Sequence, residues 1–172
     1  INIKDIDQKL NSISKNLILS NSGEAIIMND NSSKGIILRG YTNQDFPKLE
    51  IIKNKNFIGD KNNMTQNYIS IGKELSFILD VKIGDKITIM STSGVQTIIG
   101  SLPKQKTFII KSFFESGLVD FDNNVAFINL ETLEKFLDLE NKNRNLEVYL
   151  KNPQNIENQK VMIQKIFPNE FI

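Results

Sequence analysis

Short strand-like runs alternate with amphipathic stretches in the last third of this chain, and that order limits the folds open to it. The expected series is a strand over 125–128, a helix over 130–137, a strand over 146–150, and a helix that opens at Pro153 or Asn155, uses Ile156, Ile163 and Ile166, and stops at Pro168. Asn129 is a suitable N-cap because its side chain can accept a hydrogen bond from the first helical turn. Together with a lone N-terminal helix and strand, this order predicts an α+β fold whose main lobe is split by an insertion.

The first two-thirds of the chain carry fewer signals. Apolar residues spaced three and four apart from Ile3 to Leu17 predict an amphipathic helix, which either lies on a sheet or continues upward as a stalk from a membrane helix. The other expected elements are strands over 17–28 and 35–41 joined by a turn at 29–33, a long polar connection over 42–67, a strand over 68–71, a helix over 75–79, strands over 86–90 and 107–111, and core residues at Phe113 and Phe114.

Composition excludes several classes of protein. With 172 residues, of which 40% are apolar and 24% charged, the chain can form one domain or two small lobes and is too apolar for disorder. No apolar run approaches the ~18 residues that a membrane-spanning helix needs. The formal net charge of +1 provides no general attraction for nucleic acid, so we expect no nucleic-acid partner.

The chain starts at Ile1 without Met or a signal segment and ends abruptly, so we expect a piece of a longer protein.

The sequence does not favour an enzyme. The absence of Cys and His excludes thiol and imidazole catalysis, disulfides and the usual zinc sites, and no phosphate-binding or dinucleotide-binding glycine motif is present. Asp120 and Asp122 could hold a hard cation through carboxylate oxygens, but residues 121–124 are more typical of a solvated turn before a strand. Basic residues at 53–57 are typical of a solvated loop. We therefore expect no catalytic residue, no metal and no cofactor.

The segment 91–103 allows two interpretations. One is a plain hairpin that turns at Ser93-Gly94, with Val95, Thr97 and Ile99 covering a core. The other is an arm that holds apolar side chains in solvent, where they are costly unless a partner covers them. Pro103 favours weakened pairing in this region, because proline cannot donate a ladder hydrogen bond.

Five stretches resemble a known permease family. Ile69-Ser70-Ile71-Gly72-Lys73-Glu74-Leu75, followed by Leu79-Asp80-Val81-Lys82-Ile83-Gly84-Asp85-Lys86-Ile87, resembles a segment of the periplasmic domains of MacB-type ABC permeases. Leu102-Pro103-Lys104-Gln105-Lys106-Thr107-Phe108, Ser116-Gly117-Leu118-Val119-Asp120 and Asn124-Val125-Ala126-Phe127-Ile128 resemble the LolC/LolE lipoprotein-releasing branch. The resemblance covers about residues 34–150.

This resemblance implies an architecture and a location. It implies a periplasmic domain between the first two membrane helices of an inner-membrane permease, and this fragment would itself be soluble. The fold would combine a porter-like α+β lobe, residues 1–43 and 113–172, with an inserted, mainly β, Sabre-like lobe, residues 44–112. The inserted lobe would carry a protruding hairpin loop at about 91–106.

The resemblance also implies partners. The permease would extract outer-membrane lipoproteins with a separate LolD-like cytoplasmic ATPase and a second LolC/LolE-like permease subunit, and would pass their acyl chains to the periplasmic chaperone LolA. In LolC-like members a hook loop enters the chaperone, above a polar pad. By alignment, the hook residues are Ile98, Ile99, Gly100, Leu102 and Pro103, and the pad residues are Gln105, Lys106 and Thr88.

Two departures from the family pattern concern the hook and the pad. A Pro-Met pair expected at the tip is Ile98-Ile99 here, which keeps an apolar plug. The second cation of the pad falls on Thr88, so Lys86 or Lys104 would have to compensate for it.

Three other functions stay open at this point. A LolE-like subunit would receive lipoprotein without recruiting the chaperone, and would show a short, well-packed hairpin at 91–103. A MacB-like efflux permease or an FtsX-like signalling permease would bind another periplasmic partner. A carboxylate-dependent hydrolase would place Asp120 and Asp122 in a cleft with another acid nearby.

Overall fold

The computed structural model describes residues 3–98 and 100–167. Contacts within the chain divide it into two compact units, one of residues 1–18 with 146–172 and one of residues 19–145. No helix in the described ranges is long and apolar enough to cross a membrane. The larger unit carries the candidate site.

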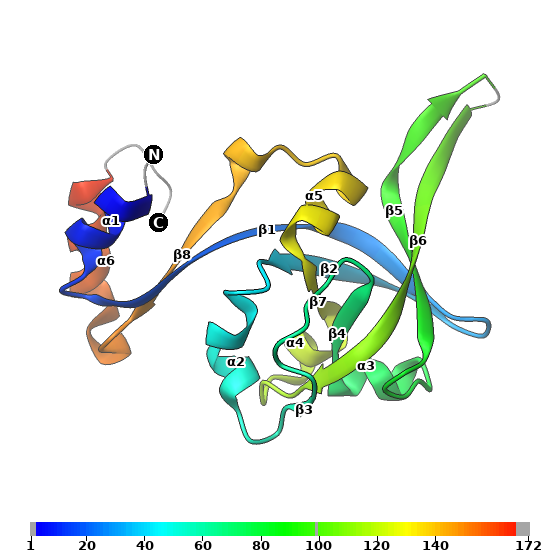
Figure 1. Cartoon of the computed structure of the whole chain (residues 1–172), viewed down its shortest axis with the longest axis horizontal. Coiled ribbons are helices and arrows are strands. Elements are labelled where there is room, and N and C mark those ends of the chain that lie inside the picture. Colours follow the sequence, from blue (N-terminus) through cyan, green and yellow to red (C-terminus); the bar gives the residue numbers. More distant parts are fainter. Residues whose placement is uncertain (1–2, 99, 168–172) are drawn as a thin grey trace. The chain divides into compact units, whose positions relative to one another are not determined.

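The larger unit is built on strands that pair into a closed ring. Its elements are β1 (Ser14–Met28, which begins in the smaller unit), β2 (Ser33–Tyr41), η1 (Phe46–Lys48), α2 (Glu50–Lys53), β3 (Ile58–Gly59), β4 (Tyr68–Gly72), α3 (Lys73–Ile78), β5 (Lys86–Thr97), β6 (Gly100–Phe114), α4 (Val119–Asn124), β7 (Val125–Asn129), α5 (Leu130–Leu137) and η2 (Asn141–Asn143). The strand order is β2-β7-β4-β6-β5-β1, and β1 pairs with β2 to close the ring (Figure 1). The pairs β2–β7 and β4–β6 are parallel, and the other pairs are antiparallel. The ring is therefore a small mixed barrel.

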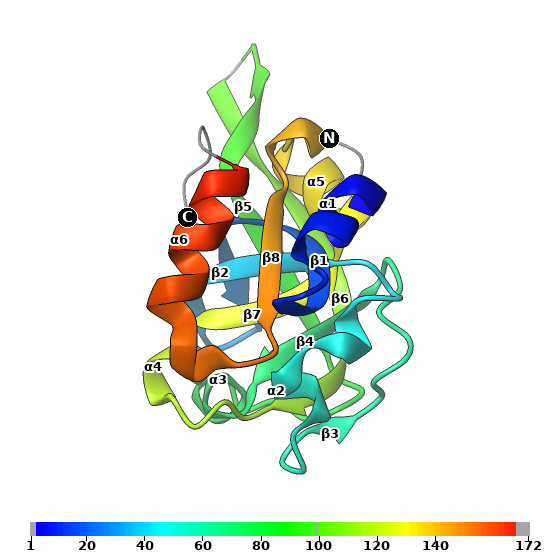
Figure 2. The same ribbon diagram turned by 90° about the vertical axis from the view of Figure 1, so that its left-hand side faces the viewer.

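Alternating apolar residues fill this barrel. Ile27 from β1, Ile89 from β5 and Phe108 from β6 are all fully buried in one cluster. Helix α5 adds Leu133 and Leu137 to that cluster, and α3 adds Leu75. In Figures 1 and 2, α5 lies toward one end of the barrel, and α3 and α4 lie toward the other.

Residues 42–67 were expected to form a long polar connection, and the structure corrects this. They contain η1, α2 and β3, and they bury apolar side chains that include Phe46 and Ile52. Phe46 contacts Phe127 of β7 edge to face, with ring centroids 6.1 Å apart. The apolar residues here lack a clear period because short turns, rather than one long element, bring each of them to the barrel wall.

The smaller unit contains α1 (Ile3–Leu10), the first residues of β1, β8 (Asn145–Leu150), η3 (Pro153–Asn155) and α6 (Ile156–Ile166). Strand β8 pairs with β1. The core of this unit is formed by the buried residues Ile6, Leu10, Ile13 and Ile163, with Leu17, Leu146, Val148, Leu150, Ile166 and Phe167 packed against them.

Two expectations about the smaller unit are corrected. The N-terminal helix ends at Leu10 rather than extending to Leu17, because Ile13 and Leu17 belong to a turn and a strand that serve the same core. Ile156 opens α6 but is exposed, so it is not part of the buried face that Ile163 provides. The predicted stop at Pro168 lies outside the described residues.

Most other predicted elements are confirmed. The α+β class is confirmed, and so are the strands at β1, β2, β4, β7 and β8 and the helix α5 over 130–137. Asn129 caps α5 as expected, its Oδ1 accepting a hydrogen bond from the backbone N–H of Thr132 at 3.1 Å. The boundaries of the two compact units do not coincide with the predicted lobe boundaries, because strands from both predicted lobes share the one barrel. The division into a porter-like and an inserted lobe stays a prediction.

Candidate functional site: the β5–β6 hairpin and the groove at its base

The hairpin of β5 and β6 is the most projecting part of the larger unit. Its inner half belongs to the barrel wall, where β5 pairs with β1 up to Ser91 and β6 pairs with β4 from Ile109. Beyond Ser91 and Lys104 the two strands pair only with each other, up to Thr97 opposite Gly100. Figures 1 and 2 both show this outer half extending away from the barrel.

A bulge separates the two halves of the hairpin. Met90 pairs with Gln105 and Gly94 with Pro103, so three residues of β5 lie opposite Lys104 alone. The Oγ of Ser91, a buried side chain, accepts a hydrogen bond from the backbone N–H of Lys104 at 3.0 Å. Such a bulge bends the strand and changes its direction, so it aims the outer half away from the barrel. Pro103 itself pairs with Gly94, and the register shift lies next to it, opposite Lys104.

The predicted hook residues lie in the outer half. Ile98 stands at the turn with its side chain fully exposed (106% of the reference area), and Leu102 is 53% exposed. Gly100 and Pro103 are exposed as well, and Gly100 has φ +121°, a conformation that other residues rarely adopt. Ile99, the other predicted tip residue, lies outside the described residues. The alternative turn at Ser93-Gly94 is wrong, because Gly94 pairs with Pro103 within the hairpin.

The predicted pad residues lie on the inner half, on two different faces. Thr88 pairs with Thr107, and its hydroxyl lies 3.4 Å from that of Thr107. Since side chains alternate along a strand, Gln105 is on the same face as Thr107 and Thr88, and its amide lies 3.7 Å from the sulfur of Met90.

Lys106 is on the other face, together with Phe108. Its ammonium group lies 5.5 Å from the centre of the Phe108 ring and donates a hydrogen bond to Asn67 Oδ1 at 3.2 Å. The structure therefore brings Thr88 and Gln105 to one face of the hairpin and separates Lys106 from them.

A groove lies at the base of the hairpin, where β6 faces α5. It has a volume of about 610 Å³ and is lined by Gln66, Lys104, Gln105, Lys106, Thr132, Lys135 and Phe136. Lys104 forms an ion pair with Asp138 at 2.5 Å, which ties β6 to the residue that follows α5. Neither Lys135 nor Thr132 was expected to lie here from the sequence, because α5 and β6 come together only in the fold.

The turn at Gly84-Asp85, within the segment that resembles MacB-type permeases, has a structural role in this chain. Gly84 has φ +100°, and its N–H donates to Ile110 O at 2.8 Å. The backbone oxygen of Asp85 accepts a hydrogen bond from the backbone N–H of Ile110 at 2.9 Å. The carboxylate of Asp85 accepts a second hydrogen bond from the backbone N–H of Lys82 at 2.8 Å. This turn therefore fixes the start of β5 against β6 and sets the register of the hairpin.

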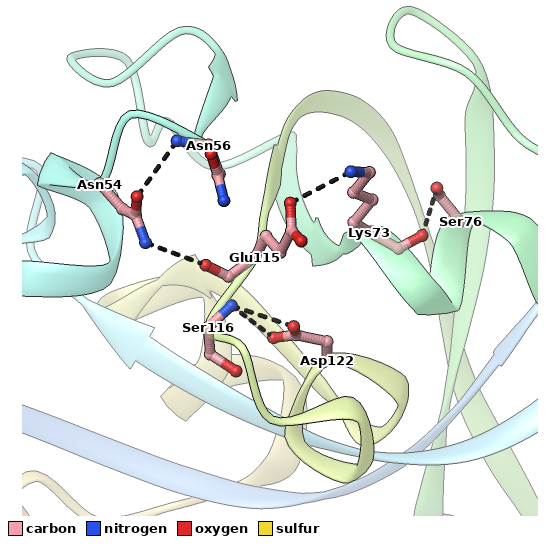
Figure 3. Close-up of polar contacts among 7 residues, drawn as sticks. All are labelled: Asn54, Asn56, Lys73, Ser76, Glu115, Ser116 and Asp122. Atoms are coloured by element: carbon pink, nitrogen blue, oxygen red, sulfur yellow. Dashed lines mark hydrogen bonds and ion pairs between the residues drawn. The ribbon is translucent and has the colours of Figure 1, made fainter.

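The segment that begins at Ser116-Gly117 is held by the polar network drawn in Figure 3. The Ser116 N–H donates to both carboxylate oxygens of Asp122 at 3.0 Å, and the Glu115 carboxylate pairs with Lys73 of α3 at 3.1 Å. Asn54 donates to the backbone oxygen of Glu115 at 3.4 Å. These contacts fix the chain as it passes from β6 into α4.

The expectation of a solvated turn at 121–124 is therefore wrong. Asp122 lies within α4 and is 2% exposed. Its carboxylate is buried because it accepts hydrogen bonds from the backbone N–H of Ser116. Asp120 is exposed, and its backbone oxygen accepts a hydrogen bond from Asn124. Within the described ranges, no group of three or more metal-ligating side chains comes together.

Glu134 of α5 forms a partly buried ion pair with Arg144, which follows η2. Arg144 donates two hydrogen bonds, both 2.7 Å, to the two carboxylate oxygens of Glu134. Asn21 of β1 donates to Glu134 Oε1 at 3.4 Å. The hydrogen bonds from Arg144 lower the pKa of Glu134, although burial acts against that shift. Glu134 thus joins α5 to β1 and to the segment after η2 within the larger unit.

Comparison with known proteins identifies relatives of this chain by sequence. No family model matches it. The lipoprotein-releasing system transmembrane protein LolC of Xylella fastidiosa is 26% identical over 106 residues, which are 60% of this chain and 26% of that protein. LolC of Neisseria meningitidis serogroup B is 24% identical over 136 residues, 78% of this chain and 33% of that protein. The chain thus spans about a quarter to a third of the length of these curated relatives.

Solved structures agree with this relationship at the level of the fold. The extracellular domain of the ABC-type transporter YknZ from Gram-positive bacteria covers 99% of this chain with a TM-score of 0.55 and 12% identity, and 86% of that domain is covered. The periplasmic region of MacB from Actinobacillus actinomycetemcomitans covers 96% with a TM-score of 0.54 and 9% identity, and 74% of that region is covered. The chain has a MacB-like fold. The predicted resemblance to LolC is confirmed by the sequence comparison, and the predicted MacB-like fold is confirmed by the structural comparison.

Proposed function

We propose that this MacB-like chain is the periplasmic domain of an inner-membrane ABC permease that releases outer-membrane lipoproteins, and that it recruits a LolA-like chaperone through the β5–β6 hairpin. The permease would work with a separate ATPase and a second permease subunit. The similarity to LolC supports the permease assignment. The observation that carries the recruitment step is the exposure of Ile98 at the end of the projecting hairpin.

Physical chemistry explains why exposed apolar residues at this place favour a binding role. An isoleucine side chain held in water gives up roughly 1.5–3 kcal/mol that burial would provide. The inner half of the same hairpin buries Ile87 and Ile89, so an apolar side chain there contributes to the fold. Ile98 and Leu102 contribute nothing comparable to this chain, and an apolar cavity in a partner would cover them.

The length of the hairpin also supports a LolC-like rather than a LolE-like role. The LolE-like alternative predicts a short, well-packed hairpin at 91–103. Pairing instead continues to Thr97 and Gly100, and the Ile98 side chain contacts solvent.

Site-specific crosslinking tests the proposal. A photo-crosslinking amino acid at position 98 should form an adduct with the LolA-like chaperone, and Ile98→Asp should abolish binding. Ile58, which is 52% exposed on β3, is the matched control, and Ile58→Asp should leave binding unchanged. Absence of an adduct at position 98, together with unchanged binding by Ile98→Asp, would rule the recruitment role out.

A further inference from the structure

Strand β8 of the smaller unit has one edge without a neighbouring strand. In the described part of the chain it pairs with β1 alone. Backbone N–H groups alternate between the two edges of a strand, and the N–H of Lys151, at the end of β8, donates to Ile13 O on the β1 side at 2.9 Å. The backbone groups of Leu146, Val148 and Leu150 therefore point toward the other edge, where the described residues provide no strand.

This edge of β8 lacks common protection against strand pairing. Native proteins blunt a free edge with lysine, with proline or with a very short strand. The six residues of β8 include neither lysine nor proline, and valine and tyrosine among them favour the strand conformation. An extended segment of protein is the class of partner that satisfies the backbone groups of such an edge.

The sequence of β8 is complementary to itself when two copies run antiparallel. With Val148 opposite Val148 of the second copy, Leu146 lies opposite Leu150, so all three outward-pointing residues form hydrogen-bonded pairs. A shift of two residues in either direction leaves Leu146 or Leu150 opposite a residue outside the strand. The three side chains pack on the core of the smaller unit, and residues that lie opposite each other share a face, so the apolar faces of the two copies join.

Helix α6 provides an independent observation in the same unit. Ile163 packs α6 on the core that β8 also covers, and the two elements can be followed together in Figure 2. Val161 and Met162 of α6 are nevertheless 55% and 48% exposed. A two-fold axis through Val148, perpendicular to the sheet, keeps both α6 helices on one side of the joined sheet. There the α6 of each copy can cover exposed apolar side chains of the other.

We propose that β8 pairs edge to edge with β8 of a second copy of this chain, which extends the two strands of the smaller unit into a four-stranded sheet with both α6 helices on one face. This surface is separate from the β5–β6 hairpin, and the inference does not depend on a chaperone.

Disulfide crosslinking tests the register, because the natural chain contains no cysteine. Under mild oxidation Val148→Cys should form a covalent dimer about tenfold faster than Leu118→Cys, although Leu118 is 67% exposed, because pairing raises the effective concentration of the two thiols. A mixture of Leu146→Cys and Leu150→Cys chains should crosslink, whereas Leu146→Cys alone should not. Faster crosslinking at position 118, or equal crosslinking of Leu146→Cys alone and in the mixture, would overturn the pairing.

Sedimentation of the full chain over a range of concentrations tests the role of α6. Met162→Asp should weaken self-association about tenfold, because it places a charge in the contact. Phe77→Asp, at a 66% exposed position on α3, is the matched control and should leave self-association unchanged. Equal losses for the two variants would overturn the α6 contact. A wild-type chain that stays monomeric would overturn the pairing between copies and leave the edge to an extended segment of another protein.

Discussion

Both halves of the β5–β6 hairpin carry apolar residues, but the two halves have opposite surroundings. In the inner half, Ile87 and Ile89 point into the barrel and are buried, and both strands have a further partner on their other edge. In the outer half the strands pair only with each other, and Ile98 and Leu102 are exposed. An isolated two-stranded hairpin is marginally stable in water. The stability of this element therefore resides in its inner half, and its capacity for binding resides in its outer half.

The bulge at Ser91 makes this difference possible. Without it, β5 would continue along β1, and the side chains beyond Ser91 would stay in the barrel wall. The bulge ends that pairing while the Ser91 hydroxyl satisfies the Lys104 N–H. Substitutions in each half, and at the contacts that anchor the barrel, test whether the two halves are as independent as this arrangement implies.

Truncation of an apolar side chain in each half should show the largest difference in stability between the two halves. Phe108→Ala in the inner half removes a fully buried ring and should lower the free energy of unfolding by about 3–5 kcal/mol. Leu102→Ala in the outer half should change it by less than about 0.5 kcal/mol. Urea denaturation followed by circular dichroism measures both values. Similar losses for the two variants would show that the outer half contributes to the fold.

The Glu134–Arg144 pair should make stability depend on acid pH. The pKa of Glu134 is lowered in the folded protein, so its contribution is fully present above the pKa of the unfolded chain, about 4.3, and is lost as pH falls through the lower folded value. Glu134→Gln should cost about 1–3 kcal/mol at neutral pH and should reduce the fall in stability below about pH 4.3.

Glu24→Gln is the control for this experiment, since Glu24 is an exposed carboxylate on β1. The free energy of unfolding should depend on pH between pH 7 and pH 3 in Glu24→Gln as it does in the wild-type chain. The same pH dependence in Glu134→Gln as well would mean that other carboxylates set the acid sensitivity. The hairpin should be unaffected by either change, since neither residue lies on it.

Removal of the Ser91 hydroxyl should have a smaller effect. Ser91→Ala leaves the Lys104 N–H without its acceptor and should cost about 1 kcal/mol. Thr92→Ala, one residue further on at an exposed position, should cost less than about 0.5 kcal/mol. Hydrogen exchange at Lys104 should accelerate in Ser91→Ala and not in Thr92→Ala. Unchanged exchange at Lys104 in both variants would argue against the bond as the anchor of the bulge.

Substitution at the turn should have the smallest effect on global stability. Gly100→Ala meets no atom within 4 Å, but φ +121° is unfavourable for alanine. The turn can relax without disturbing the barrel, so the free energy of unfolding should fall by less than about 0.5 kcal/mol. Thermal unfolding provides the measurement, and a loss above about 1 kcal/mol would show that the turn is coupled to the barrel.

Local sequence patterns predicted the regular parts of the molecule well. Helix α5 and its Asn129 cap follow from spacing and side-chain chemistry that act over a few residues. The sequence pattern did not predict the buried residues of 42–67, because short turns bring each of them to the core separately. It also did not predict the burial of Asp122, because that carboxylate is held by a single hydrogen-bond donor, the Ser116 N–H. The hook residues could be named from the sequence, but Lys135 could not, since no local signal joins α5 to β6.

The sequence by itself determined the α+β class, the order of the elements and the apolar character of the segment near residue 98, because these depend on local spacing and composition. Only the tertiary structure decided which alternating strand residues face the barrel and which face solvent. That choice depends on the closure of β1 onto β2 and on the bulge at Ser91, which are set by partners far away in the chain. The same physical cause creates the groove that Lys106 and Lys135 line, since a groove between two elements exists only once both have packed on one core.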